Sequence, residues 1–219
     1  LHLPEATHER VTHNTPYRAG KGHTYEGGQR VPLIVRWPDG IPGGRVVDSP
    51  VNNIDWIPTL LELAGVPPPE GLDGISFAAG LTSGTFPERP LFWHFPHYTN
   101  QGGRPSGAMR DGDWLLVELY DSGQAELYDL RSDVGEQHDL ASQHPERVAA
   151  MRAALAAWRR DNHAQNNIPN PDCDEQLYRA IYTDFDASTF DPPNADAAQW
   201  TRAREWRKAM DQAVRDTVT

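Results

Sequence analysis

The stretch Gly20-Lys21-Gly22-His23-Thr24-Tyr25-Glu26-Gly27-Gly28-Gln29-Arg30-Val31-Pro32 carries most of what this chain reveals about its fold. Its lysine stands between two glycines, and the chain has only one other lysine, Lys208, beside 18 arginines. Glycine lets backbone approach a ligand closely, and an ammonium group is a compact, mobile charge that suits an oxyanion. A solvated lysine in a turn is the ordinary interpretation of such a triplet. The residues that follow Lys21 decide between a lysine that binds an oxyanion and a lysine that is merely solvated.

This stretch resembles the sulfatase family of the alkaline-phosphatase superfamily, whose members typically carry G-K-x-x-x-[YF]-E-G-G-x-R-x-P. The chain matches every fixed position in order. The resemblance implies that Lys21 contacts the sulfate ester and stabilises charge that develops on oxygen during S–O cleavage, a kind of interaction that often contributes most to catalysis. It also implies a scaffold role for Glu26, Gly27, Gly28 and Arg30. We expect the paired glycines to form a tight turn and Arg30 to pair with a buried carboxylate.

Other stretches resemble the same family, between about Asn14 and Trp158. They are Asn53–Gly65, Leu72–Phe77, Arg89–Tyr98, Ala108–Val117 and Glu126–Ala141. The first also reads as a helix from its residues alone: Asp55 can cap it, Pro58 is tolerated in the first turn, and Gly65 ends it. The chain departs from the family at two positions that look structural, with Leu115 in place of a frequent Lys and Asp139 in place of the usual Asn.

The family's nucleophile motif, C/S-x-P/A-x-R, has no convincing match. The single cysteine, Cys173, lacks both the Pro and the Arg. The minimal match Ser106–Arg110 lies downstream of Lys21 and leads into an expected strand, so its context is wrong. The family's calcium ion needs several oxygen ligands, and the Asp-Asn pair that would supply some of them does not precede Lys21. We therefore expect the formylglycine and the calcium ligands in a missing N-terminal portion of the same protein, no metal ligand in this chain, and no activity of the chain alone.

Composition sets broad limits on the class of protein. The 219 residues allow one large or two small domains, and the net charge of −11 argues against non-specific binding to nucleic acid or to an anionic membrane. No apolar run reaches the roughly 18 residues of a transmembrane helix. One cysteine permits no internal disulfide. The sequence leaves localisation open between a periplasmic or secreted protein and a cytoplasmic one.

The fold class that we predict is α/β: the end of an alkaline-phosphatase-like α/β domain, then a smaller α+β subdomain. Residues 1–85 would form the first part and include a buried strand at Val31–Trp37. Residues 86–165 would hold a roughly four-stranded antiparallel sheet and a packed helix, and residues 166–219 an extension that ends in a helix. The expected sheet strands lie near Leu91–Phe95, Gly107–Arg110, Trp114–Tyr120 and Gln124–Leu130, the last two joined through Asp121-Ser122-Gly123.

Two helices are expected after the sheet. The first spans about Pro145 to Arg160, and its apolar side chains recur at spacings of three and four, so they share one face. These are Val148, Met151, Leu155 and Trp158. The second spans about Ala195 to Arg215, where Trp200 and Trp206 are expected to pack.

Four residues besides Lys21 are candidate substrate contacts. His23 lies two residues past Lys21, His94 and His97 flank Pro96 after a strand, and Arg104 lies in a glycine-rich loop that could recognise a sugar or a sulfate. Each has an alternative interpretation as a packed, hydrogen-bonded or solvated side chain. His2, His8 and His13 border the same region and are weaker candidates.

The leading hypothesis is the C-terminal part of a sulfatase that hydrolyses sulfate esters on a carbohydrate, with a sulfated small molecule or glycan as substrate. One alternative is a phosphonate monoester or phosphodiester hydrolase of the same superfamily, which relative turnover of aryl sulfates and aryl phosphodiesters would distinguish. Another is a non-catalytic fragment that binds a partner chain or a sulfated glycan, which binding without turnover would reveal.

Overall fold

A computed structural model describes residues 13–216 and divides the chain into two compact units. Unit 1 joins the residues up to Val31 with those from Phe92 onward, and unit 2 is Pro32–Leu91. The Lys21 stretch therefore packs with the later part of the chain, although 60 residues of unit 2 separate them in sequence. The predicted boundaries after residues 85 and 165 remain predictions about the domains of the whole protein.

A four-stranded sheet in the order β1-β2-β3-β4 organises unit 1, as predicted. Its strands are β1 (Leu91–Phe95), β2 (Ser106–Asp111), β3 (Trp114–Leu119) and β4 (Ala125–Asp129). The pairs β2–β3 and β3–β4 are antiparallel, so side chains directly opposite one another share a face of the sheet. Gly123, with a φ of 69°, lies in the predicted turn between β3 and β4.

One face of the sheet carries helix α4 (Pro145–Asp161). Met109, Leu116 and Leu127 lie opposite one another across the three strands, and Leu155 of α4 packs against them. All four predicted apolar residues of the helix belong to this cluster, and Trp158 stacks on Phe92 with ring centroids 5.3 Å apart. The prediction of a packed amphipathic helix is confirmed.

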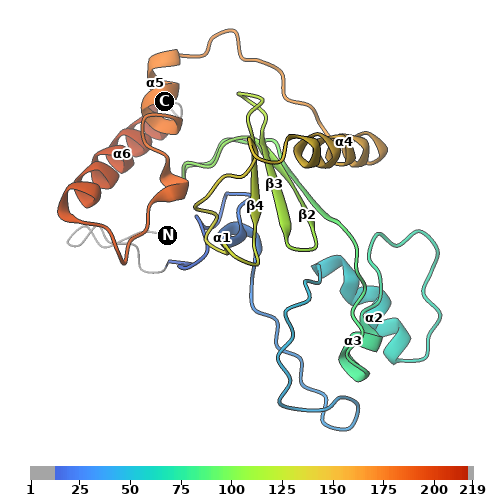
Figure 1. The fold of residues 1–219 in the computed structure, drawn as a ribbon. Helices are drawn as coiled ribbons and strands as arrows, with labels where there is room; N and C mark the ends of the chain where they lie inside the picture. The colour runs from blue at the N-terminus through green and yellow to red at the C-terminus, as the bar shows by residue number, and fades with distance from the viewer. Residues whose placement is uncertain (1–12, 217–219) are drawn as a thin grey trace. The chain divides into compact units, whose positions relative to one another are not determined.

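The opposite face of the sheet is covered by the Lys21 stretch and its short helix α1 (Glu26–Gln29), which Figure 1 shows on the far side from α4. Tyr25 is buried there among side chains of the alternate register. They are Ala108, Leu115, Val117, Leu119, Tyr128 and Leu130. The sheet is therefore buried on both faces, and the Lys21 stretch is part of its core.

The last part of the chain forms α5 (Glu175–Tyr182), the 3₁₀ turn η2 (Ala187–Thr189) and α6 (Ala197–Asp216). Figure 1 shows α5 and α6 side by side, and they share a small core of Ile181, Ala187, Trp206 and Met210. The predicted terminal helix is confirmed, and Trp206 is in its core. Helix α5 was not predicted. Among residues 13–216, no helix combines the length and apolar character that crossing a membrane requires.

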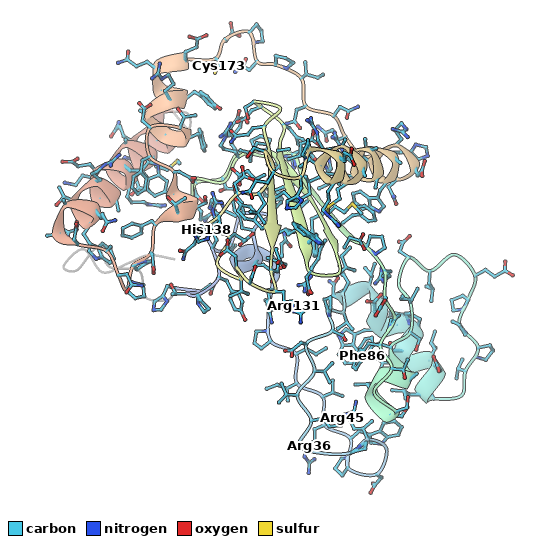
Figure 2. All side chains as sticks on the ribbon, in the orientation of Figure 1. Arg36, Arg45, Phe86, Arg131, His138 and Cys173 are labelled. Carbon is cyan, nitrogen blue, oxygen red and sulfur yellow. The ribbon has the colours of Figure 1, made fainter. Side chains whose placement is uncertain are left out.

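Unit 2 contains η1 (Asn53–Asp55), α2 (Trp56–Leu63) and α3 (Ala78–Thr82). Arg45 and Phe86, labelled in Figure 2, both meet α3 at Gly80. The Arg45 guanidinium donates to the Gly80 carbonyl at 2.5 Å, and a Cβ on Gly80 would lie 2.7 Å from the Phe86 ring.

The strand expected at Val31–Trp37 is not present in the structure. The segment has no regular secondary structure, and Ile34 is 90% exposed. A strand needs a neighbour that satisfies its backbone groups, and among residues 13–216 no strand pairs with this segment. The apolar pattern predicted a buried position, and the contacts within the described residues do not provide one.

Asp55 does not cap α2, contrary to the prediction. Its carboxylate accepts the backbone N–H of Asn52 at 2.7 Å and that of Ile75 at 2.9 Å, and it also binds Arg89. Asn52 completes a capping box one turn earlier, at η1. The carboxylate therefore joins the start of α2 to Ile75, in the segment that follows the helix.

Candidate functional site

Lys21 lies in a turn between two glycines, and its side chain is exposed. Gly22 has a φ of 93°, a conformation that glycine adopts without the steric cost of a side chain. Within residues 13–216, no hydrogen bond or ion pair holds the Lys21 ammonium group. The turn thus presents a cation that is available to a ligand.

The three residues after His23 anchor this turn to the sheet. Each makes a side-chain hydrogen bond to a strand, and all the partners lie on the face opposite α4. The bonds are Thr24 Oγ1 to Ser106 Oγ at 3.0 Å, Tyr25 Oη to Glu126 Oε2 at 2.8 Å, and Arg110 Nη1 to Glu26 Oε1 at 3.4 Å. An exposed Lys21 side chain therefore extends from an anchored backbone.

Gly27 and Gly28 are required by close backbone contact, not by the tight turn that was expected. A Cβ on Gly27 would overlap the Arg18 carbonyl oxygen, and one on Gly28 would overlap the carbonyl oxygen of His23 and lie 2.8 Å from that of Gly20. Neither glycine has a positive φ. Helix α1 can therefore lie directly on the Lys21 turn only because both residues lack side chains.

Arg30 pairs with a buried carboxylate, as predicted. Its Nη1 lies 3.3 Å from Glu26 Oε2, and the Glu26 side chain is only 4% exposed. Arg110 of β2 reaches the other oxygen of the same carboxylate. The glutamate of the motif thus pairs with two arginines and joins α1 to the sheet.

The 98–104 loop (Tyr98–Arg104) packs against the Lys21 turn. The His23 ring nitrogen Nε2 lies 3.2 Å from the Gln101 carbonyl oxygen, so this candidate substrate contact is buried and bonded to the loop. A Cβ on Gly22 would lie 2.9 Å from Thr99 Oγ1, and one on Gly103 would overlap the Gly22 carbonyl oxygen. The loop and the turn touch along their backbones.

The two other candidate histidines have different surroundings. His94 Nε2 lies 2.8 Å from the Gln165 carbonyl oxygen and Nδ1 lies 2.9 Å from Tyr120 Oη. Because a carbonyl only accepts, Nε2 carries the proton and Nδ1 accepts from the tyrosine. Burial lowers the pKa of His94, which favours this neutral form. His97 is exposed and meets the edge of Phe95.

Arg104 forms a two-pronged ion pair with Asp121, with Nε 2.9 Å from Oδ2 and Nη2 2.6 Å from Oδ1. The hydroxyl groups of Tyr98 and Tyr178 also donate to Oδ2. The guanidinium of Arg104 is therefore engaged by a carboxylate of the β3–β4 turn. The structure brings Lys21, His23 and the 98–104 loop together, while His2 and His8 lie outside the described residues.

A buried polar network around Tyr25 was not predicted. The Arg18 guanidinium lies 3.9 Å from the centre of the Tyr25 ring and donates to Tyr128 Oη at 2.6 Å and to Glu126 Oε2 at 3.3 Å. Glu136, also buried, accepts the backbone N–H of Glu26 at 3.0 Å. Arg18 lies outside the sequence motif, so no pattern indicated its position under the ring of Tyr25.

The comparison with protein families identifies the chain. Residues 19–161 match the family described as N-sulphoglucosamine sulphohydrolase, C-terminal. The chain belongs to this sulfatase family. The match contains the Lys21 turn, the sheet and α4, and stops before the extension that holds α5 and α6.

Two curated sulfatases show how much of a relative the chain represents. A sulfatase of Formosa agariphila is 34% identical over 185 residues, which cover 76% of this chain and 34% of that protein. The N-acetylgalactosamine-6-sulfatase of Canis lupus familiaris is 39% identical over 83 residues, which cover 37% of this chain and 16% of that enzyme. The chain thus spans about a third or less of the length of these relatives.

A solved structure agrees with the fold. Ps i-CgsB in complex with k-i-k-neocarrahexaose superposes with a TM-score of 0.61 at 26% identity, covering 73% of this chain and 35% of that one. The sulfatase region described here therefore has a fold that occurs in an experimentally determined relative.

The described residues do not fit the metal ion that the resemblance to sulfatases implies. Within residues 13–216, no three His, Cys, Asp or Glu side chains gather as a metal site requires. Cys173 is exposed in the segment before α5, far along the chain from Lys21 (Figure 2).

Proposed function

We propose that this chain is the C-terminal part of a sulfatase that hydrolyses sulfate esters of a carbohydrate, and that Lys21 binds the sulfate. The observation that carries the proposal is an exposed, unbonded ammonium group on a backbone anchored to the sheet, inside a region that belongs to the sulfatase family. Support for a carbohydrate comes from the relatives, one named for a 6-sulfated sugar and another bound to a hexaose.

Hydrolysis of a sulfate ester would be favoured by a cation at the position of Lys21. Cleavage of the S–O bond leaves negative charge on the bridging ester oxygen, and a positive group fixed nearby stabilises that state more than it stabilises the intact ester, whose bridging oxygen carries no formal charge. Lysine suits the task because its ammonium group is compact and donates three hydrogen bonds. The anchored turn limits the rearrangement needed to bring it there.

The proposal includes a further portion of the same polypeptide, which together with this chain we call the complete enzyme. The relatives are about three times as long as the matched region or longer. We expect that portion to carry the nucleophile and any metal ligands, since the described residues assemble no cluster of ligands. In that arrangement, the chain alone binds sulfate weakly and does not turn over.

Substitution of Lys21 in the complete enzyme tests the proposal. Lys21→Ala should lower kcat for an aryl sulfate by at least about 100-fold, the usual effect of losing a group that stabilises the transition state. Lys208→Ala is the matched control, because it removes the only other lysine, which is exposed on α6. Turnover close to that of the unmodified enzyme after Lys21→Ala would rule out this role. Higher kcat/KM on an aryl phosphodiester than on the sulfate would contradict the proposed substrate class.

A further inference from the structure

The extension that follows the family match contacts the surroundings of Lys21. We call the segment from α5 through η2 to α6 (residues 175–216) the C-terminal latch. Its own core holds it together: Trp206 is 8% exposed and its indole N–H donates to the Ile181 carbonyl at 2.8 Å. The latch is thus a small folded element and not a loose tail.

The latch packs on the outer side of the 98–104 loop. A Cβ on Gly102 would lie 2.6 Å from the Ala187 Cβ and 2.9 Å from Trp206 Cζ2, so the loop backbone touches the core of the latch. Gly102 also has a φ of 86°, which favours glycine. Arg207 of α6 donates to the Asn100 carbonyl at 2.7 Å. These contacts leave no space for a side chain between loop and latch.

The inner side of the same loop packs on the Lys21 turn, through Gly103 against Gly22 and through Gln101 against His23. Gly102 and its neighbour Gly103 therefore meet different partners, one on each side. The loop is held between the latch and the residues that flank Lys21. Displacement of the latch would allow the loop to move, and the turn would then lose its contacts with Gln101 and Gly103.

A second contact joins the latch to Arg18, which precedes the Lys21 stretch. The Arg18 guanidinium donates to Ser188 Oγ at 2.8 Å and pairs with Asp186 at 3.3 Å, both at η2. The backbone carbonyl of Arg18 also accepts the N–H of Gly27 at 2.9 Å, so Arg18 is bonded to helix α1 as well. The latch therefore contacts both the 98–104 loop and Arg18, and each of these packs against the Lys21 stretch.

We propose that the C-terminal latch is a positioning element of the sulfate site, with Trp206 as its key positioning residue. The latch presses the 98–104 loop onto the Lys21 turn and thereby fixes where the ammonium group can reach. This inference rests on the proposed role of Lys21. It assigns a function to a segment that lies outside the matched sulfatase region.

Three variants test the inference in the complete enzyme. Trp206→Ala removes the side chain behind Gly102, Trp206→Phe keeps much of its apolar volume, and Gly102→Ala inserts a methyl group between loop and latch without replacing any residue of the latch core. Trp200→Ala is the matched control: it removes an indole from the same helix, where the ring meets Phe190 at 5.0 Å. Gly102→Ala keeps the test decisive if Trp206→Ala fails to fold.

We expect kcat on a sulfate ester to fall about 10- to 100-fold in Trp206→Ala and in Gly102→Ala, the scale of a catalytic group misplaced by about an ångström. Trp206→Phe should restore part of it, and Trp200→Ala should change it less than about threefold. Amide hydrogen exchange of residues 20–25 and 98–104 should become faster in the first two variants at unchanged protection of the sheet, which a general loss of stability would not produce.

Two outcomes overturn the inference while the proposed function stands: unchanged kcat in Gly102→Ala, or faster exchange confined to the latch, each beside a large loss in Lys21→Ala. If Lys21→Ala leaves turnover unchanged, the proposed function fails, and the positioning role fails with it. The exchange data then still report whether the latch orders the turn.

Discussion

The carboxyl group of Glu136 is buried and accepts a single hydrogen bond among the described residues. One oxygen accepts the backbone N–H of Glu26, and the other is buried without a hydrogen-bond partner among the described residues. Arg18 donates to the Glu136 backbone carbonyl at 3.3 Å, and its other hydrogen bonds go to Glu126, Tyr128, Ser188 and Asp186 instead of the Glu136 carboxyl group. Burial, aided by the neighbouring carboxylates of Glu26 and Glu126, raises the pKa of Glu136 to about 8.

The stability of the protein should therefore depend on pH through Glu136. Between its usual pKa of 4.5 and about 8, the folded protein keeps the proton that the unfolded chain has lost, so the free energy of unfolding falls as pH rises. The slope should not exceed about 1.4 kcal/mol per pH unit. Glu136→Gln imitates the protonated acid and should match the parent near pH 5 but exceed it by about 1–3 kcal/mol at pH 8.

Urea unfolding at several pH values measures this difference. Glu70→Gln, which neutralises an exposed carboxyl group of a loop in unit 2, is the control for a simple change of net charge. A constant difference between Glu136→Gln and the parent from pH 5 to pH 8 would show that Glu136 is ionised throughout.

Residues inside the motif could be predicted, and residues outside it could not. Lys21 lies in the glycine-flanked turn that its stretch indicates, and the buried partner of Arg30 was predicted correctly, because both follow from the spacing of one short stretch. The contact of Lys21 with sulfate stays a prediction. Arg18 and Glu136 are separated by 118 residues and meet only in the fold. The roles of His23, His94, His97 and Arg104 as substrate contacts stay predictions.

At the scale of the element, the two faces of the sheet have separate tasks. Helix α4 stabilises one face through apolar contact, while the Lys21 stretch is bonded to the other through polar side chains. Because a strand alternates its side chains, neighbouring residues such as Leu115 and Leu116 serve different tasks. Stability and site geometry should therefore be separable by substitution.

Leu155→Ala tests this separation. The side chain is fully buried in the α4 cluster, so its loss should lower the free energy of unfolding by about 2–5 kcal/mol. In the complete enzyme, kcat measured on the folded fraction should stay within about threefold of the parent, since Lys21 lies on the other face. Arg160→Ala, an exposed change on the same helix, is the control for stability. A large loss of kcat without unfolding would show that the faces are coupled.

Elements with local patterns were predicted well, and elements that depend on distant partners were not. The four sheet strands and α4 carry regular apolar spacing between clear turns, and the structure has them within a residue or two. Val31–Trp37 has an equally apolar pattern but no pairing partner among the described residues, so it forms no strand. Helix α5 was missed because its eight residues are few and lie among prolines and aspartates.

At the scale of the whole molecule, unit 2 differs from unit 1 in how its apolar residues are placed. Val46 is 93% exposed and Ile34 is 90% exposed, and further large apolar side chains of the unit also face solvent. Exposed apolar surface on this scale is typical of an interface. Since the relatives are several times longer than the matched region, we expect the remaining portion of the complete enzyme to cover these side chains.

Ile34→Lys distinguishes a covered surface from a solvent-facing one. In the chain by itself, the substitution should reduce the binding of a dye that reports exposed apolar surface and reduce self-association at high concentration, without lowering stability. In the complete enzyme, it should instead destabilise the protein by about 2 kcal/mol or more, because a charge would be buried without a partner. Glu62→Gln, at an exposed polar position of α2, is the control, because it changes the net charge by the same single positive unit. Equal stability of the complete enzyme with and without Ile34→Lys would place this segment in solvent and contradict the expected interface.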